Sequence, residues 1–304
     1  MRLIIDTDIG TDVDDLWTLA MLPGLANVSL EAVTVVYGDT DLRARLAAVA
    51  LSAMSIKAPV YRGCEHTMSG KAVMWAGHEG LHVAGLTDAN YATGDAVDVL
   101  IERAAINPGS LDIVAIGPLT NIATAVLRDP AFASNVRHLT LMGGEFTRGW
   151  PEHNFSSDAA ATEIVLTSGM SMTIMPLNQT LRVMIDQSDT QRIADAHPIG
   201  TLMADQAQRF WAWLATRVPS ATGTSSAAHD PAALLTLFEP SLFTFTPMTI
   251  DAFGSGGFDG RIRGAADATS LINVVTDMNA LGVHEALLRV LAGNADTLKP
   301  ANRS

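Results

Sequence analysis

Cysteine is nearly absent from this chain of 304 residues, which contains Cys64 alone. A single thiol excludes a disulfide within the chain and fits a reducing compartment. The sequence also lacks an uncharged apolar run of about twenty residues, the length that crosses a bilayer. Its start has no apolar segment of the kind found in secretory signals. We therefore expect a cytoplasmic protein without a membrane partner.

Basic residues are also scarce. The chain has 19 Lys and Arg against 32 Asp and Glu, for a formal net charge of −13. Affinity for nucleic-acid phosphates comes mainly from Lys and Arg, so this balance argues against a nucleic-acid partner. Small neutral or cationic ligands fit the charge better. Hydrophobic residues make up 48% of the sequence, enough to bury a large core.

Apolar, β-branched runs alternate with helical patterns along most of the chain. We expect strands at 3–5, 30–37, 58–63, 111–116, 136–142, 171–177, 249–252 and 271–275, and helices at 14–22, 42–54, 98–105, 158–166, 189–217, 232–237 and 281–291. Such alternation predicts an α/β fold whose mainly parallel, open Rossmann-like central sheet is flanked by helices. No linker or repeat interrupts it, so we expect one domain over residues 1–304.

Two segments have no regular pattern. Residues 65–95 are rich in Gly, His, Thr and Asp, which predicts a long loop of the kind that is often functional. Its His78 and His82 are interpreted as surface or capping residues. Residues 218–228 are mostly small, and we interpret them as a mobile lid.

Five carboxylates lie within ten residues directly after the first expected strand, namely Asp6, Asp8, Asp12, Asp14 and Asp15. Like charges this close raise one another's pKa unless a cation or hydrogen bonds neutralise them. In open α/β sheets, the loop after a strand lies at the edge where ligands bind. Oxygen ligands favour calcium or magnesium over zinc. The stretch predicts a divalent-metal site, and the alternative is a solvated acidic loop with acidic helix caps.

Polar groups follow later strands and should reach the same edge of the sheet. Asp39 follows strand 30–37, and the carbonyl of Ile116 ends strand 111–116, where it is free to act as an oxygen ligand. An irregular loop after strand 136–142 carries Glu152-His153-Asn154. Finally, His229-Asp230 precede a proline in the first turn of a helix, where proline is tolerated.

Taken together, these motifs resemble the nucleoside hydrolase family, the inosine- and uridine-preferring nucleoside N-ribohydrolases. The resemblance covers nearly the whole chain, and it is specific because several motifs occur in the family's order and spacing. They are Asp6-Thr7-Asp8-Ile9-Gly10 with Asp14-Asp15, Ile116-Gly117-Pro118-Leu119-Thr120-Asn121, Met142-Gly143-Gly144, Glu152-His153-Asn154 and His229-Asp230-Pro231. The resemblance implies calcium-dependent hydrolysis of the N-glycosidic bond of ribonucleosides, giving free base and ribose. It also suggests a homodimer or homotetramer.

The resemblance further implies a role for each carboxylate. Calcium would be held by Asp8, Asp15, Asp230 and the backbone carbonyl of Ile116, a set of oxygen ligands that suits this ion. Asp8 would also be catalytic, because it would take a proton from the metal-bound water that attacks C1′. Asp14 would bind the 2′- and 3′-hydroxyls of the sugar. Asp6 would lie behind the metal-binding and sugar-binding carboxylates and support their positions.

The remaining candidates would bind the rest of the substrate. Glu152 and Asn154 match the family pair that binds the far side of the sugar, including its 5′-hydroxyl. His229 matches the family's proposed general acid, which protonates the departing base or supports it by hydrogen bonds. Trp213 is expected to stack on the nucleobase, as is Trp211 nearby, and core packing is the alternative for both.

The chain departs from the family pattern in four places. Gly10 and the Asp14-Asp15 pair are separated by two more residues than in the commonest motif. If Asp14-Asp15 is aligned with the family motif by the apolar helix that follows the pair, Asp12 is an extra carboxylate. If the alignment is instead counted from Gly10, Asp12 takes the role that we assign to Asp14. Asp39 stands in place of the usual Asn, and we count this aspartate as a substrate-binding candidate. The other two departures are Ala76-Gly77 in place of His-Gly, and Thr147 or Trp150 in place of a sugar-binding Asn.

Two other functions fit part of the pattern. Asp6-Thr7-Asp8 after a strand is also the arrangement of aspartate-nucleophile phosphatases. However, Gly10 stands where that chemistry usually has Thr or Val, and no suitable later lysine is evident. The second is a protein of the same fold that binds nucleosides or sugars through a metal and is non-catalytic or of altered specificity. The change at Asp39 and the short loop before Glu152 are the reasons to consider it.

Overall fold

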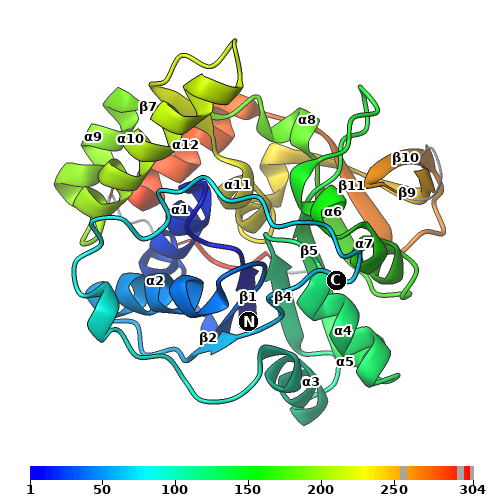
Figure 1. Cartoon of the computed structure of the whole chain (residues 1–304). Helices are drawn as coiled ribbons and strands as arrows, with labels where there is room; N and C mark the ends of the chain where they lie inside the picture. Colours follow the sequence, from blue (N-terminus) through cyan, green and yellow to red (C-terminus); the bar gives the residue numbers. More distant parts are fainter. Residues whose placement is uncertain (254–258, 293–297, 302–304) are drawn as a thin grey trace.

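A nine-stranded sheet runs through the centre of the computed structural model, which describes residues 1–253, 259–292 and 298–301 (Figure 1). Its strand order is β10-β9-β11-β6-β5-β4-β1-β2-β3. Pairing is parallel from β11 through β6 to β3, and β9 is antiparallel to both β11 and β10. The expected single-domain α/β fold with a mainly parallel sheet is confirmed. The strands are β1 (Arg2–Thr7), β2 (Ser29–Val35), β3 (Val60–Arg62), β4 (Leu111–Ala115), β5 (Val136–Met142), β6 (Met172–Met175), β9 (Phe243–Phe253), β10 (Arg261–Ala266) and β11 (Ile272–Met278).

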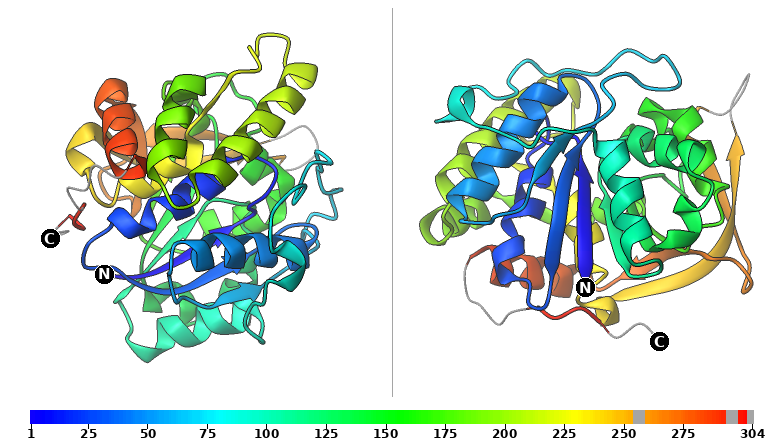
Figure 2. Two further views of the ribbon diagram at one scale, coloured as in Figure 1. Left: turned by 90° about the vertical axis from the view of Figure 1, so that its left-hand side faces the viewer. Right: turned by 90° about the horizontal axis from the view of Figure 1, so that it is seen from below.

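Helices cover both faces of the sheet, as the two further views show (Figure 2). They are α1 (Asp14–Ala20), α2 (Thr40–Ala53), α3 (Ala96–Ile106), α4 (Thr120–Arg128), α5 (Phe132–Asn135), α6 (His153–Ser157), α7 (Ala159–Leu166), α8 (Leu177–Thr180), α9 (Gln187–Ala196), α10 (Gly200–Arg217), α11 (His229–Leu235) and α12 (Ala280–Leu291). None of the helices in the described part of the chain is long and apolar enough to cross a membrane.

The central strand β1 contributes to two hydrophobic cores, one on each face of the sheet. Leu3 and Ile5 pack with α1, α2, α10, α11 and α12, whereas Ile4 packs with α3, α4 and α7. Successive side chains of a strand point to opposite faces, so three consecutive apolar residues serve both cores. This double burial explains why the strand is a continuous apolar run rather than an alternating one.

The single long helix expected at 189–217 is wrong, because the chain forms two helices there. Pro198 lacks an N–H and disfavours helical geometry in the residue before it. His197 accordingly adopts an extended conformation, with φ −98° and ψ 141°, and ends α9. Its Nε2 lies 2.9 Å from the carbonyl oxygen of Ala20, which ties the break to the end of α1.

Five other expectations also need correction. Part of the expected lid at 218–228 is strand β8 (Ser225–Ala227), which pairs with β7 (Met184–Asp186) in a separate two-stranded sheet. The strand at 249–252 is longer than expected, and β10 was not expected at all. Two short helices, α6 and α8, occupy positions that were interpreted as a polar loop and a strand end. By contrast, most of the long loop at 65–95 is irregular, as expected.

The carboxyl ends of β1, β4 and β5 meet at one edge of the sheet and lead into the acidic loop, the turn after Ile116 and Gly143-Gly144. Two of these loops approach so closely that a side chain at Gly117 would not fit. A Cβ there would lie 2.8 Å from Oδ1 of Asp8. Gly117 therefore allows Asp8 to lie directly beside the end of β4, at the edge of the sheet where the candidate site lies.

Candidate active site

A cavity of about 260 Å³ opens at this edge of the sheet, and acidic side chains line it: Asp8, Asp12, Asp14, Asp15, Glu152 and Asp230. Three of them, Asp14, Asp15 and Asp230, are buried and offer carboxylate oxygens within 4.8 Å of one another. The first two begin α1 and the third lies in the first turn of α11, which packs against α1. Two helix starts thus bring together carboxylates that are 215 positions apart, from Asp15 to Asp230.

The three buried carboxyl groups have pKa values well above the ordinary value. Burial is the main cause for each, and the second is the charge of a neighbour: Asp12 for Asp14, Asp8 for Asp15, and Asp14 for Asp230. Deprotonated carboxylates in this arrangement need positive charge to balance them. Buried carboxylate oxygens within mutual reach are the donor set that a hard divalent cation prefers, so the residues fit such an ion.

Asp8 lines the same cavity but is not one of the three mutually close carboxylates. Its loop is held by Thr7, whose hydroxyl donates to Oδ1 of Asp15 and accepts from the backbone N–H of Ile9 at 3.1 Å. Ile116 also lines the cavity, and its carbonyl accepts a hydrogen bond from Nδ2 of Asn154 at 3.1 Å. A carbonyl oxygen has two lone pairs, so Ile116 retains capacity for a further partner.

Asp6 lies behind the cavity rather than in its lining. Its Oδ1 accepts hydrogen bonds from the Thr34 hydroxyl at 2.6 Å and from Nδ2 of Asn121 at 2.7 Å. Burial raises its pKa to about 7, against the lowering effect of these bonds. Asp6 thereby joins β1, β2 and α4 beneath the acidic loop.

Arg43 is a buried cation under the acidic loop that sequence reasoning missed. Its guanidinium donates to the carbonyl oxygens of Asp8 and Ile9, the latter at 2.9 Å, and to that of Tyr37 at 2.6 Å. It also stacks against Trp75, 4.9 Å from the ring centre. Backbone oxygens accept most of its hydrogen bonds, so Arg43 fixes the shape of the loop as well as offsetting part of its charge.

Glu152 and Asn154 form one side of the cavity. The Glu152 carboxylate caps α6 and accepts from the backbone N–H groups of Asn154 at 2.8 Å, and of Phe155 and Gly144 at 3.0 Å each. Burial raises its pKa. Asn154 Nδ2 bridges the carbonyls of Ile116 and Met142, at 3.1 and 3.2 Å. These bonds hold both side chains in fixed positions at the cavity wall.

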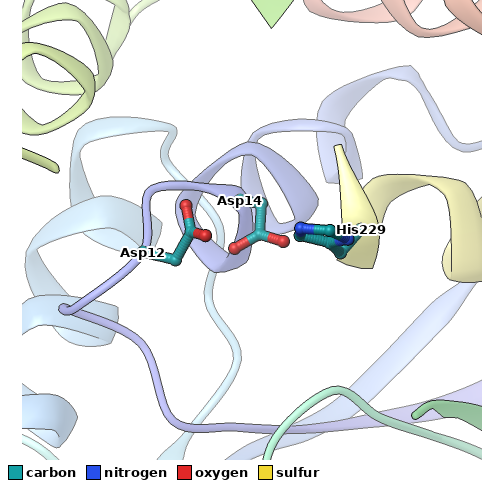
Figure 3. A group of neighbouring side chains, drawn as sticks. All are labelled: Asp12, Asp14 and His229. Atoms are coloured by element: carbon teal, nitrogen blue, oxygen red, sulfur yellow. The ribbon is translucent and has the colours of Figure 1, made fainter. Parts of the chain in front are cut away.

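Another part of the wall combines a histidine with aromatic rings. Phe210 and Trp213 on α10 line the cavity and stack on each other, with ring centres 5.8 Å apart and planes at 25°. His229 begins α11, and its side chain lies beside those of Asp12 and Asp14, with a ring nitrogen turned toward Asp14 (Figure 3). Burial lowers the pKa of His229 to about 4. Flat apolar rings next to a proton-exchanging group suit the binding of a heterocyclic base.

Comparison with known proteins places the whole arrangement in a family. Residues 3–285 match the sequence profile of the inosine-uridine preferring nucleoside hydrolases. The chain belongs to this family. As a nucleoside hydrolase it is an enzyme that acts on the N-glycosyl bonds of nucleosides.

Relatives of this nucleoside hydrolase occur in plants and bacteria. A probable uridine nucleosidase of Oryza sativa is 30% identical over 259 residues, covering 80% of this chain and 78% of the relative. A pyrimidine-specific ribonucleoside hydrolase of Citrobacter koseri is 30% identical over 175 residues, covering 55% of each chain. A purine-preferring ribonucleoside hydrolase structure from Gardnerella vaginalis has a TM-score of 0.84 and 24% identity, covering 97% of this chain and 99% of its own. That last likeness concerns the fold alone.

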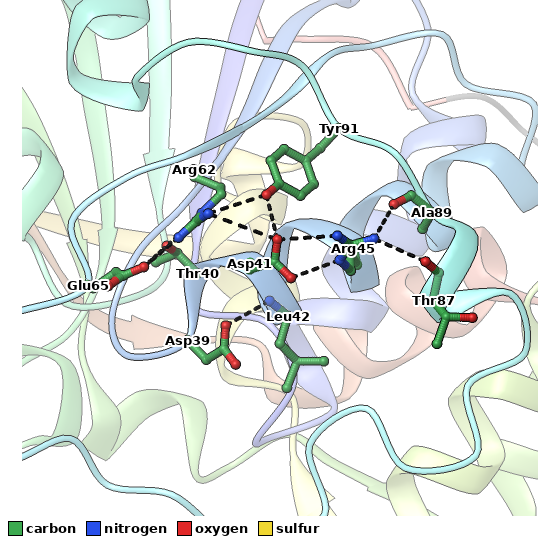
Figure 4. A network of polar contacts seen from close by, with 10 residues as sticks. All are labelled: Asp39, Thr40, Asp41, Leu42, Arg45, Arg62, Glu65, Thr87, Ala89 and Tyr91. Carbon is green, nitrogen blue, oxygen red and sulfur yellow. Dashed lines mark hydrogen bonds and ion pairs between the residues drawn. The ribbon is translucent and has the colours of Figure 1, made fainter.

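The nucleoside hydrolase brings most of its predicted site residues to one cavity: Asp8, Asp14, Asp15, Ile116, Glu152, Asn154, Trp213, His229 and Asp230. Asp39 does not line this cavity. Its exposed carboxylate caps α2 by accepting from the backbone N–H of Leu42 at 3.0 Å (Figure 4). Trp211 belongs to the hydrophobic core, where its Nε1 donates to the Ser226 hydroxyl at 2.9 Å.

Asp12 lines the cavity of the hydrolase, so the lengthened acidic loop folds inward. Thr11 next to it is held by the long loop at 65–95. Its hydroxyl donates to Oε1 of Glu79 at 3.0 Å, and its carbonyl lies 2.8 Å from Nε2 of His78. Both partners are buried, although His78 was interpreted as a surface or capping residue. The long loop thus positions the part of the acidic loop that departs from the family pattern.

The long loop is itself fastened to α2 by a network of polar contacts (Figure 4). The Tyr91 hydroxyl donates to Asp41 at 2.5 Å, and Arg45 donates to the carbonyl of Ala89 at 2.8 Å. Arg62 forms an ion pair with Glu65 at 2.5 Å. These groups are partly exposed, so each contact is weak alone, but together they fix both ends of the loop.

We expect Glu79→Ala to lower kcat/KM for nucleosides by about tenfold or more, since hydrogen bonds to a carboxylate contribute about 1.5–3 kcal/mol each. Glu79 accepts from the backbone N–H groups of Ala76 at 2.6 Å and Gly77 at 2.7 Å as well as from Thr11, so its loss releases the acidic loop. The measurement is steady-state ribose release. Asp88→Ala is the matched control, because Asp88 is an exposed acidic residue on the same loop outside the cavity. Equal activities of the two variants would contradict the anchoring role.

Proposed function

We propose that this nucleoside hydrolase is a calcium-dependent ribonucleoside N-ribohydrolase that releases free base and ribose. The observation that carries the proposal is the set of buried carboxylates, Asp14, Asp15 and Asp230, within 4.8 Å of one another beside Asp8. We further propose that residues 1–304 act as one domain, and that the enzyme is cytoplasmic and a homodimer or homotetramer. The single cysteine supports that compartment.

The carboxylates of Asp8, Asp15 and Asp230 and the carbonyl of Ile116 would hold the calcium ion. Calcium accepts six to eight oxygen ligands in flexible geometry, which suits a site built from side-chain and backbone oxygens of two helix starts and a strand end. When bound, the ion supplies positive charge that makes a coordinated water more acidic and orients sugar hydroxyls. Asp14 is close enough to Asp15 and Asp230 to bind those hydroxyls at the edge of the metal site.

Asp8 accepts the proton of the water molecule that attacks C1′ of the ribosyl group. As the N-glycosidic bond breaks, positive charge develops on the sugar ring, as in glycoside hydrolysis. The carboxylates of Asp14 and Glu152 stabilise that charge more than they stabilise the neutral substrate, which lowers the barrier. Asn154 and Glu152 hold the far side of the sugar, including its 5′-hydroxyl.

The departing base lies between the aromatic rings and His229. Trp213 stacks on its face, and Phe210 behind it keeps the tryptophan ring in place. His229 protonates the base or donates a hydrogen bond to it as it leaves. Burial lowers the pKa of His229 to about 4, so at neutral pH the charged ring is a minor form and, when present, a strong proton donor.

Metal-dependent release of ribose from nucleosides tests this proposal. We expect the purified protein to release ribose from uridine, the substrate that the relatives' names suggest. Turnover should fall below detection with a calcium chelator and return with added calcium. Inosine, cytidine, adenosine and guanosine complete the panel and define the base preference. Nucleoside binding without ribose release would favour the non-catalytic alternative, and phosphate release from phosphomonoesters without ribose release would favour the phosphatase alternative.

A further inference from the structure

We propose that Thr180 is a positioning residue for His229, because its hydroxyl determines which ring nitrogen meets the departing base. The inference rests on the proposed function and adds to it a residue outside the family motifs that the sequence carries. Thr180 is the last residue of α8, the short helix that follows β6, and its side chain is completely buried. Helix α8 packs against α11, at whose first residue His229 stands.

In the described part of the chain, the Thr180 hydroxyl has two hydrogen-bond partners. Its Oγ1 lies 2.6 Å from Nδ1 of His229 and 3.2 Å from the carbonyl oxygen of Leu177. A carbonyl accepts and cannot donate. Both contacts are therefore hydrogen bonds at the same time only if the hydroxyl donates to Leu177 and accepts from Nδ1–H. This chain of donors places a proton on Nδ1 and leaves Nε2 as the nitrogen available to a ligand.

The orientation of the His229 ring depends on this bond. Among the described residues, Thr180 is its hydrogen-bond partner at Nδ1, and no other side chain holds the ring in that way. Its other polar neighbours, Asp12 and Asp14, lie together on one side of the ring (Figure 3), and both line the cavity. A hydrogen bond to one nitrogen of an imidazole fixes the role of the other nitrogen, which is how proteins set the tautomer of functional histidines.

The chemical consequence concerns the leaving group. When the bond between C1′ and the base nitrogen breaks, its electron pair goes to the base. In the proposed general-acid step the ring carries a second proton on Nε2 besides the one on Nδ1, and this second proton neutralises the base. The ring is then neutral and keeps its proton on Nδ1, still bonded to Thr180. Meanwhile water adds to C1′ and loses its proton to Asp8, so the products are ribose and the free base. Thr180 acts by keeping Nε2 pointed at the base throughout.

The test compares Thr180→Val, which keeps the side-chain shape and removes the hydroxyl, with Thr180→Ser, which keeps the hydroxyl. Each is assayed with uridine and with 4-nitrophenyl riboside, whose leaving group departs as a stable anion and needs no proton. We expect Thr180→Val to lower kcat on uridine by about tenfold or more, since positioned proton transfer contributes about 10²–10⁴-fold. Its kcat on 4-nitrophenyl riboside should stay within about twofold of wild type. Thr180→Ser should resemble wild type on both substrates.

Equal losses on both substrates in Thr180→Val would overturn the inference, because a merely structural defect does not depend on the leaving group. Undiminished turnover of uridine would overturn it as well. If Thr180→Val does not fold, Thr180→Ala is compared with Thr180→Ser on both substrates. Both variants lack the threonine methyl group, and they differ from each other only in the hydroxyl. Absence of ribose release from either substrate by the wild-type enzyme with calcium would instead reject the proposed function, and so the two failures are distinguishable.

Discussion

Asp8→Ala is expected to abolish ribose release, with kcat reduced by about a thousandfold or more. Asp8 lies at the end of the central strand and lines the cavity beside the three mutually close carboxylates. The substitution removes a proposed calcium ligand and the group that accepts the proton of the attacking water. Loss of one well-placed electrostatic group commonly reduces kcat by about 10²–10³-fold, and here a proton acceptor is lost as well. The measurement is ribose release from uridine at saturating calcium.

Asp39→Ala is the matched control for this variant. Asp39 is also an aspartate in a loop after a parallel strand, but its carboxylate caps α2 and lies outside the cavity. Loss of an N-cap costs about 1 kcal/mol of stability, so the control should unfold at a slightly lower temperature and keep most of its activity. Turnover by Asp8→Ala at the level of Asp39→Ala would refute the catalytic assignment. A strong loss of turnover in Asp39→Ala would instead support the substrate-binding role that the sequence suggested.

Calcium is expected to stabilise the protein at pH 8 far more than at pH 5. A ligand present at a hundred times its Kd stabilises the folded state by about 2.7 kcal/mol. At about 2–4 °C per kcal/mol, this raises Tm by roughly 5 °C or more. At pH 5 the buried carboxyl groups hold protons that the ion must displace, so the increase should be about 2 °C or less. The measurement is thermal unfolding with and without calcium at both pH values.

Two further carboxyl groups, those of Asp6 and Asp12, affect the stability of the metal-free protein. The pKa of Asp6 is raised to about 7 and that of Asp12 to about 8, in both cases mainly by burial, from the ordinary value of 3.8. At pH values between the ordinary pKa of 3.8 and these raised pKa values, the folded chain binds more protons than the unfolded chain. The free energy of unfolding of the metal-free protein therefore falls as pH rises from about 4 toward 8.

Asp230→Ala provides the control for the effect of calcium. The variant lacks one of the three mutually close carboxylates, so its Tm should respond little to calcium at either pH. It also has one buried charge fewer, which should make the metal-free variant less sensitive to alkaline pH than the metal-free wild type. An equal rise in Tm at pH 5 and pH 8 in the wild-type protein would mean that the ion binds elsewhere.

The fold was largely predictable because its signals are local. The apolar run 3–5 is buried on both faces of the sheet and could only be a central strand, and the polar groups after each strand marked the functional edge. The break between α9 and α10 was also a local signal, since His197-Pro198 is visible in the sequence. The antiparallel strands β9 and β10 were harder to predict, because their pairing depends on contacts with each other rather than on a strong apolar pattern.

Parts of the site depend on contacts between distant positions and left no such signal. Thr11 and Glu79 are 68 positions apart, and Thr180 and His229 are 49 apart. Nothing in the residue types near either pair specifies its partner. The buried guanidinium of Arg43 looks like an ordinary surface residue in an Ala- and Leu-rich helical pattern. Such pairings are decided by how the loops pack over the sheet.

Arg43 has a consequence for how the enzyme acquires its metal ion. Because the guanidinium binds the backbone carbonyls of Asp8 and Ile9, it can hold this loop in its folded shape without an ion. The conformational entropy of ordering the loop is then lost during folding and is not subtracted from the affinity for the ion. The proposed calcium ion would meet a loop that is already ordered, so we expect its binding to change the charge of the site more than the backbone around it.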